Sequence, residues 1–232
     1  MHKICQNGEI VLLDNAYLHN NLWGEESGSG AQCCWIEAFS ENTKCINWKT
    51  SWEWEEANNS IKSFASIVHG WHFGWKNSNT EFPIKIDNMQ KIDSFWKFEL
   101  KENIEGNLNI TYDMWFSNRQ IDSENPDGEI MIWLYKKGNV PPIGKKVKEI
   151  EVGGIIWDLW IGLHPQFSWP VFSFIKQKNT TEAKLELHKF ITEICRNENY
   201  NFTYLLGIQS GIEVLSGAGT FSTTEYFIEI EK

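Results

Sequence analysis

Short segments rich in β-branched and aromatic residues follow one another along the chain, separated by clusters of Gly, Pro, Asn and Asp. Many strands at short spacing are typical of a β-sandwich or a jelly roll. The 232 residues suit one all-β domain, which we expect to span 1–232. Strands are predicted at 11–17, 45–54, 63–68, 96–101, 107–116, 129–135, 148–161, 170–176, 204–208 and 226–231.

One segment departs from this pattern. Between 181 and 197 the apolar residues Leu187, Phe190, Ile191 and Ile194 recur at helical spacing. We therefore expect one amphipathic helix over 181–197, with Thr181 as its N-cap, packed against the outside of a sheet.

The composition limits the classes of molecule that this chain can bind. The chain has 31 acidic and 21 basic residues and a net charge of −10, whereas a nucleic-acid-binding protein needs a basic surface. No apolar run approaches the ~18 residues of a membrane span. The 13 tryptophans are more than one core easily hides, so we expect some to line a surface on which flat, uncharged rings stack.

The predicted strand 129–135 has an unusual second face. Its alternation puts Ile130 and Ile132 on a core face, and Glu129, Met131 and Trp133 on the other. A partly enclosed cleft accommodates a carboxylate, a thioether and an indole together, and this arrangement resembles a sugar-binding wall. The alternative is an edge-strand glutamate beside a second small core.

Two further carboxylates are candidates for the same chemistry. Asp113 shares a strand face with Trp115, and it could hydrogen-bond Glu129 if the two strands are neighbours. Glu213 stands among small residues that leave room for a ligand. Paired carboxylates across a cleft hydrolyse glycosidic bonds, one as an ionised group and one as an acid. The alternatives are a strand-end cap or surface ion pair for Asp113, and a solvated face for Glu213.

Several segments together resemble glycoside hydrolase family 12, the small jelly-roll endoglucanases. They are NNLWG at 20–24, YDMWF at 112–116, EIMIWL at 129–134, and GIE at 211–213 followed by GAG at 217–219. The resemblance implies two curved antiparallel sheets with a concave substrate cleft, and one α-helix packed on the convex side. It also implies retaining hydrolysis of a β-1,4-glucan such as cellulose or mixed-linkage β-glucan.

The same resemblance implies roles for individual residues. Glu129 is expected to be the nucleophile and Glu213 the acid/base, with their carboxyls about 5–5.5 Å apart. Asp113 is expected to hydrogen-bond Glu129, and Trp23 to stack on a glucose ring. The expected cleft-lining residues are Asn21, His72, Met131, Trp133, Pro142 and Gln166. No metal or organic cofactor is implied, because two carboxylates and water suffice.

The resemblance also implies a disulfide between Cys5 and Cys33, for which the adjacent Cys34 is the competitor. A disulfide and a polymeric substrate imply secretion, with the signal peptide absent from this chain. We expect a monomer that binds β-glucan and has no nucleic-acid or membrane partner. Two alternatives stay open: an endoglucanase specific for xyloglucan, and a non-catalytic glucan-binding jelly roll on the same fold.

Overall fold

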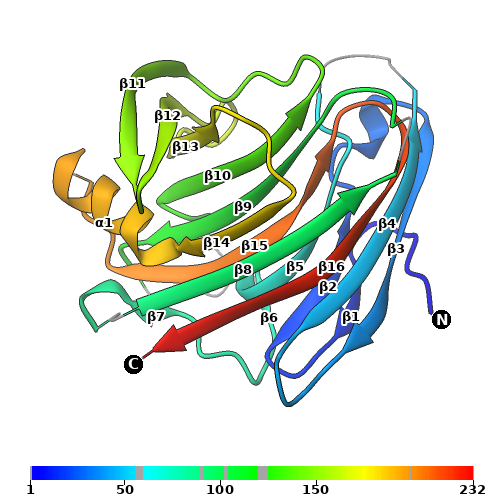
Figure 1. The fold of residues 1–232 in the computed structure, drawn as a ribbon, viewed down its shortest axis with the longest axis horizontal. Coiled ribbons are helices and arrows are strands. Elements are labelled where there is room, and N and C mark those ends of the chain that lie inside the picture. The colour runs from blue at the N-terminus through cyan, green and yellow to red at the C-terminus, as the bar shows by residue number, and fades with distance from the viewer. Residues whose placement is uncertain are drawn as a thin grey trace.

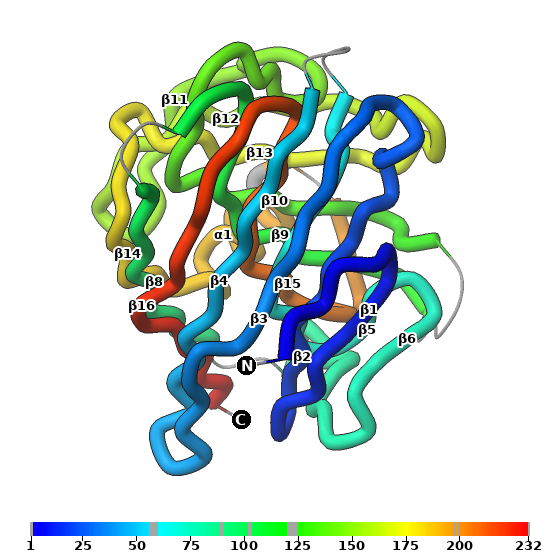
Figure 2. Tube along the Cα trace, turned by 90° about the vertical axis from the view of Figure 1, so that its right-hand side faces the viewer, coloured from blue at the N-terminus to red at the C-terminus, as the bar shows by residue number. Residues whose placement is uncertain are grey.

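Two β-sheets are packed face to face in the computed structural model, which describes residues 2–55, 60–88, 91–101, 104–119, 125–198 and 200–231. Figure 2 shows β3, β4 and β16 of the smaller sheet lying in front of β9, β10 and β15 of the larger one. The smaller sheet has the order β14 (Glu182–Glu186), β8 (Lys91–Leu100), β16 (Gly217–Glu231), β4 (Ile46–Trp54) and β3 (Gly30–Phe39).

The larger sheet has eleven described strands (Figure 1). Its main path runs in the order β1 (Glu9–Leu12), β2 (Ala16–Asn21), β5 (Ser63–His72), β15 (Tyr204–Val214), β9 (Leu108–Ser117), β10 (Gly128–Lys137), β13 (Pro170–Lys176), β12 (Ile155–Leu163) and β11 (Lys145–Val152). Two short strands extend it, β6 (Trp75–Lys76) beside β5 and β7 (Ile84–Lys85) beside β15.

The sheets are antiparallel with one exception. The chain leaves β10, forms the hairpin β11–β12 at the far edge, and returns as β13 between β12 and β10. This return makes β13 parallel to β10, in register from Glu129–Val171 to Trp133–Ile175. The predicted antiparallel sheets therefore contain one parallel junction.

The predicted strand over 148–161 is wrong in one respect, because the segment forms two strands. Gly153 and Gly154 both have positive φ (63° and 78°), which only glycine adopts freely, and they form the two-residue turn between β11 and β12. The first strand of the smaller sheet, β3, was missed by the sequence analysis.

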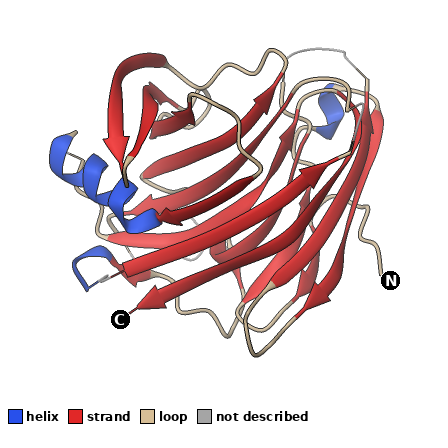
Figure 3. Cartoon of the chain, in the orientation of Figure 1, coloured by secondary structure: helices blue, strands red, loops and turns tan. Residues whose placement is uncertain are grey.

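The helix α1 is shorter than predicted and spans Leu187–Asn197 (Figure 3). The expected first turn is instead β14, which pairs with β8 from Glu182–Lys97 to Glu186–Asp93. Thr181 is not the N-cap, since its carbonyl accepts a hydrogen bond from Phe98 N at 2.9 Å. The polar–apolar pattern of this segment also suits a strand. The segment forms a strand here because the edge of β8 offers unpaired backbone groups.

The main core lies between the two sheets. Ile130, Ile132 and Leu134 are fully buried there, as the alternation predicted. The apolar face of α1 joins this core, where Phe190 contacts the rings of Trp157 and Phe174. The helix therefore packs on the same side of the larger sheet as the smaller sheet does.

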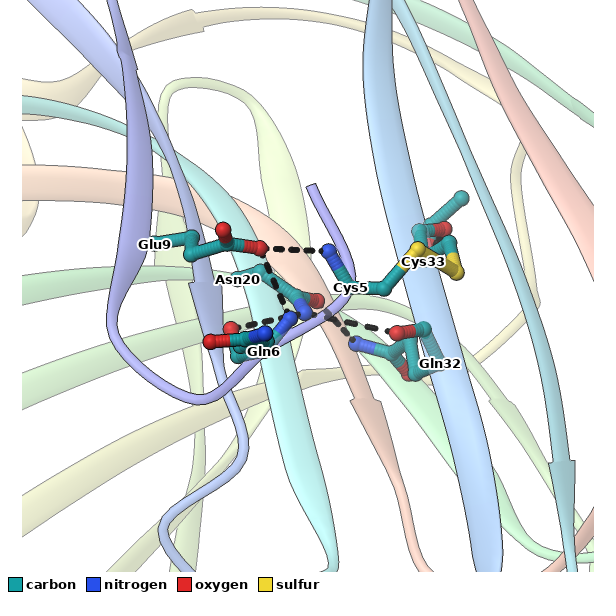
Figure 4. The surroundings of a disulfide bond; sticks show 7 residues. Cys5, Gln6, Glu9, Asn20, Gln32 and Cys33 are labelled. Carbon is teal, nitrogen blue, oxygen red and sulfur yellow. Dashed lines mark hydrogen bonds between the residues drawn. A yellow bond between two sulfur atoms is a disulfide. The ribbon is translucent and has the colours of Figure 1, made fainter. Parts of the chain in front are cut away.

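The predicted disulfide joins Cys5 to Cys33 on β3 (Figure 4). Ile4 and Cys34 exchange both backbone hydrogen bonds beside it, at 3.0 and 2.9 Å. Cys34 is buried as a free thiol, because successive side chains of β3 point to opposite faces and Cys34 points into the core. This difference in direction explains why Cys33 forms the bond.

Candidate active site

One face of the larger sheet points away from the smaller sheet, and we call it the site face. Cross-strand neighbours share a face, and the register sets Glu129 opposite Trp115, and Met131 opposite Asp113. On the other side of β9, Gln209 lies opposite Asp113. The strands of Asp113 and Glu129 are therefore neighbours, as the hydrogen-bond hypothesis required.

Glu213 of β15 also lies on the site face, opposite Asn109 of β9. The β9 partners of Glu129 and Glu213 are six residues apart, which would separate them by about 20 Å in a straight strand. Yet the charge of Glu129 raises the pKa of Glu213, so the two side chains are close. The strands must bend, and Figure 1 shows the curvature of β9, β10 and β15.

Bulges supply part of this bending. The register shifts between Trp133 and Tyr135 on β10, and between Leu205 and Gly207 on β15. A bulge inserts one extra residue on one strand, which bends that strand and increases its twist. We call the rows of Glu129 and Glu213, with the residues beside them, the two walls of the site face.

The carboxylate of Glu129 is held from two directions. The indole Nε1 of Trp169 donates a hydrogen bond to Glu129 Oε2 at 3.0 Å. The side chain of Asp113 shares a hydrogen bond with Glu129 from the neighbouring strand. Both interactions lower the pKa of Glu129, whereas burial, the larger effect, raises it.

Glu213 has a different environment. Asn109 Nδ2 donates a hydrogen bond to its Oε2 at 2.5 Å, which lowers the pKa of Glu213. Burial and the charge of Glu129 both raise that pKa, and burial is the largest cause. Once Glu129 is ionised, it therefore favours the protonated form of Glu213.

Asp113 is the carboxyl most strongly biased toward its protonated form. Burial is the largest cause of its raised pKa, followed by the charges of Glu129 and Glu213 and the hydrogen bond with Glu129. A protonated Asp113 can donate its proton to the Glu129 carboxylate. Asp113 is therefore the acid of the pair, and the hydrogen bonds to Glu129 offset part of the effect by which burial raises the pKa of Glu129.

The structure excludes the alternatives for these three residues. β10 lies inside the sheet between β9 and β13, so Glu129 is not on an edge strand. Asp113 and Glu213 are 3% and 7% exposed, which excludes a surface ion pair and a solvated face. The suggested second small core exists, however, because Met131 and Trp133 belong to a separate apolar cluster on the site face.

The predicted binding residues fall on both walls. Asn21 on β2 and Glu213 on β15 lie in the same cross-strand row, with Phe64 of β5 between them. Trp23 follows it, with 53% of its surface exposed and its backbone N–H bonded to Asn21 Oδ1 at 3.2 Å. Pro142 is buried in the loop after β10, whose Val140 and Ile143 join the apolar cluster of the site face.

His72 and Gln166 belong to the wall of Glu129. His72 ends β5 and packs against His19, and burial lowers its pKa to about 3, so it is neutral. Gln166 is exposed in the turn between β12 and β13. Met131 and Trp133 lie between the walls but are only 4% and 3% exposed, so they support the site more than they offer surface.

Two functional residues were missed by the sequence analysis. Asn109 shares the alternating face of Asp113, so the strand pattern could have identified it. Its side chain is fully buried, which makes this Asn-Ile-Thr sequon unavailable for glycosylation in the folded chain. Trp169 precedes β13 by one residue and contacts Glu129 40 positions away, and no local pattern signals that contact.

The site face also contains buried polar atoms without a hydrogen-bond partner among the described residues. Buried polar groups are nearly always paired, so such a concentration indicates a surface that meets a polar ligand. These atoms are His19 Nδ1, Ser66 Oγ, Asn109 Oδ1, Asp113 Oδ1, Trp115 Nε1, Trp133 Nε1, Ser173 Oγ, and Nε2 and Oε1 of Gln209.

Other features of the described residues lie apart from this chemistry. A pocket of about 380 Å³ opens elsewhere, lined by His69, Phe82 and Glu229 among others, and it contains none of the three carboxyls. No group of three or more His, Cys, Asp or Glu side chains in the described part of the chain could hold a metal ion. None of its helices is long and apolar enough to cross a membrane.

Comparisons with known proteins agree over almost the whole chain. Residues 15–231 match the family described as Glycosyl hydrolase family 12. A probable xyloglucan-specific endo-beta-1,4-glucanase A from Aspergillus fumigatus is 32% identical over 236 residues, covering 98% of this chain and 91% of the relative. Endoglucanase S from Pectobacterium parmentieri is 27% identical over 93% of this chain and 81% of its own length.

Solved structures show the same fold. A native family 12 xyloglucanase from Bacillus licheniformis has a TM-score of 0.89 at 24% identity, covering 99% of this chain and 100% of its own. The catalytic domain of Humicola grisea Cel12A with a soaked thio cellotetraose has a TM-score of 0.87 at 24% identity, covering 99% of both chains. These likenesses confirm the predicted jelly-roll sandwich.

Proposed function

The chain belongs to glycosyl hydrolase family 12, and we propose that it is an endo-β-1,4-glucanase that cleaves glucans with retention at the anomeric carbon. One observation carries the assignment of roles. Glu129 receives hydrogen bonds from Trp169 and Asp113, which favour its anion, whereas Glu213 receives one from Asn109, and the mutual repulsion of the two charges favours a proton on one of them. Retaining hydrolysis requires one carboxylate and one acid at opposed positions.

In the first step the Glu129 carboxylate attacks the anomeric carbon. The bond from that carbon to the glycosidic oxygen breaks, and Glu213 gives its proton to the departing oxygen. The product is a glycosyl ester on Glu129. In the second step Glu213, now a base, removes a proton from water, and the resulting oxygen attacks the same carbon and releases Glu129.

The polar atoms of the site face suit a polyhydroxylated substrate. Hydroxyl groups both donate and accept hydrogen bonds, so a glucan can pair with donors and acceptors of this face alike. The exposed ring of Trp23 offers a surface on which a glucose ring can stack, in line with its predicted role. Asn21, His72, Pro142 and Gln166 flank the two walls.

The names of the relatives include both a xyloglucan-specific enzyme and an unrestricted endoglucanase. We propose unbranched and mixed-linkage β-1,4-glucans as substrates, with xyloglucan specificity as the alternative. The disulfide between Cys5 and Cys33 and a polymeric substrate support secretion, and we propose that the enzyme acts as a monomer through the catalytic domain over 1–232. A polysaccharide is its proposed partner, rather than a nucleic acid or a membrane.

A reducing-end assay on carboxymethylcellulose, barley β-glucan and xyloglucan tests this function. Wild type and the matched control Glu99→Gln, on an exposed face of β8, should release reducing ends from at least one polymer. Glu129→Gln should lose the activity and still bind the polymer. The substrate cleaved fastest identifies the preferred polymer, and an NMR spectrum showing the β-anomer first would establish retention.

Two outcomes would contradict the proposal. A folded wild type without activity on all three polymers favours the non-catalytic glucan-binding alternative. Full activity in Glu129→Gln excludes this residue as the nucleophile. The acid role of Glu213 has its own test, since Glu213→Ala should abolish polymer cleavage but spare the first step on aryl glycosides, whose leaving group needs no proton.

A further inference from the structure

A short loop between β12 and β13 places one indole against the proposed nucleophile. Trp169 is the last residue of this loop, and its side chain is only 5% exposed. Its Nε1 donates to Glu129 Oε2 at 3.0 Å, and both groups are buried. On the same wall, the indole Nε1 of Trp115 is also buried but has no partner among the described residues.

The loop is fixed by its own backbone. His164 N donates to the carbonyl of Trp169, and Ser168 N donates to the carbonyl of His164, both at 2.8 Å. Ser168 has a φ of 62°, in the left-handed region that serine seldom adopts. Strain of this kind persists only where the surrounding structure requires it, and here it turns the next side chain toward Glu129.

Aromatic rings surround the indole. Phe167 stacks on Trp169 with ring centroids 4.8 Å apart and an interplanar angle of 1°. His164 packs at 4.6 Å, and Trp115 and Phe73 approach at 6.0 and 6.1 Å. Rings packed this closely restrict the indole to one orientation and keep water away from its hydrogen bond.

We infer that Trp169 is a positioning residue, whose indole N–H orients the Glu129 carboxylate and stabilises its anion for nucleophilic attack. This inference rests on the proposed function and deepens it. An indole N–H can only donate and does not titrate, so its bond holds at every working pH. The hydrogen bond from Asp113, by contrast, requires a proton on Asp113.

The surrounding charges are consistent with this role. Asp113 on β9 and Glu213 on β15 are the titratable groups that interact with Glu129. On the other side of Glu129, its cross-strand neighbour on β13 is Val171, which carries no charge. His164 lies against the indole, and burial lowers its pKa, which disfavours a charge at this position. After burial, the hydrogen bond from Trp169 is the largest influence on the pKa of Glu129, and it lowers that pKa.

Trp169→Phe tests the inference, because it keeps an aromatic ring and removes only the donor. Trp115→Phe is the matched control, since it removes an unpartnered indole N–H from the same wall. The pH dependence of kcat/KM is measured on an aryl β-cellobioside. In Trp169→Phe the acidic limb should move up by about one pH unit and kcat should fall roughly tenfold, with KM little changed. In the control the acidic limb should stay in place.

An acidic limb at the wild-type position in Trp169→Phe, or an equal shift in both variants, would overturn the inference. Titration of the Glu129 carboxyl by ¹³C NMR provides a test that does not depend on turnover, so an inactive wild type would refute the proposed function without ending this test. If Trp169→Phe does not fold, Trp169→Leu serves instead. It also removes the donor, so the acidic limb should again move up by about one pH unit, and a limb at the wild-type position would overturn the inference.

Discussion

At the scale of single residues, the site shows how identical groups acquire different roles. Glu129 and Glu213 are both buried carboxyls whose pKa burial raises, so burial alone cannot separate them. The separation comes from their neighbours. Glu129 has two hydrogen-bond donors, Trp169 and Asp113, whereas Glu213 has only Asn109, and the repulsion between the two charges is mutual.

Asp113 offers the first prediction at this scale. Its protonated carboxyl stabilises the Glu129 anion, so Asp113→Ala should raise the pKa of Glu129 and move the acidic limb of kcat/KM up by about one unit. Asp113→Asn keeps a donor and should leave the limb close to wild type. Identical pH profiles for the two variants would show that the hydrogen bond does not set the protonation of Glu129.

Asn109 should control the other limb. Its Nδ2 donates to Glu213 Oε2, which favours the ionised form, so Asn109→Ala should raise the pKa of Glu213. The basic limb of the pH profile then moves to higher pH by about one unit, while the acidic limb stays in place. A shift of the acidic limb alone would assign Asn109 to Glu129 instead.

The sequence allowed good predictions where function depends on strand alternation. Glu129 and Asp113 were placed on their faces by period-two spacing, Glu213 was singled out by its small neighbours, and the resemblance supplied the expected roles of all three. Asn109 was within reach of the same pattern. Trp169 was not, because its contact with Glu129 depends on a loop with a left-handed serine and on the parallel return of β13, neither of which has a local sequence signal.

At the scale of elements, errors occurred where one segment suits two structures. Residues 182–186 continue the helical pattern of α1, but they pair with the edge of β8 and form β14. The missed strand β3 includes Gly30, Gln32 and two cysteines, a composition with weak strand preference. Its pairing with β4 and the disulfide to Cys5 hold it in the sheet, and these long-range contacts are not visible in a local window.

The disulfide joins elements of both sheets and should stabilise the fold. It connects the segment before β1, on the edge of the larger sheet, to β3 of the smaller one, across 28 residues. A loop of that length implies a loss of about 3–4 kcal/mol in the free energy of unfolding for Cys5→Ala/Cys33→Ala. Urea unfolding measures it, with Cys45→Ser as a control that loses only a half-buried free thiol.

Reducing agent should lower the stability of wild type to that of the double variant and leave the double variant unchanged. Equal unfolding midpoints for the oxidised wild type and the double variant would show that the backbone pairing of Ile4 with Cys34 already fixes this edge. The disulfide would then contribute nothing measurable to the free energy of unfolding.

At the scale of the whole molecule, the buried carboxyls that enable the chemistry also lower the free energy of unfolding. Burial raises the pKa of Glu129 and of Glu213 to about 7, so the folded chain keeps protons that the unfolded chain releases near pH 4.5. A carboxyl whose pKa is raised by folding contributes stability below its unfolded pKa, and that contribution is lost as the pH rises through the folded pKa. Between about pH 4.5 and 7 the wild type should therefore lose stability.

Glu129→Gln/Glu213→Gln replaces both groups with neutral side chains of similar shape, so it should escape this loss. We expect the double variant to melt close to wild type at pH 4.5 and several degrees higher at pH 8. Differential scanning calorimetry across this range measures the difference, and the exposed substitution Glu99→Gln should follow wild type throughout. Parallel melting curves for wild type and the double variant would mean that folding leaves the two carboxyls at their ordinary pKa values.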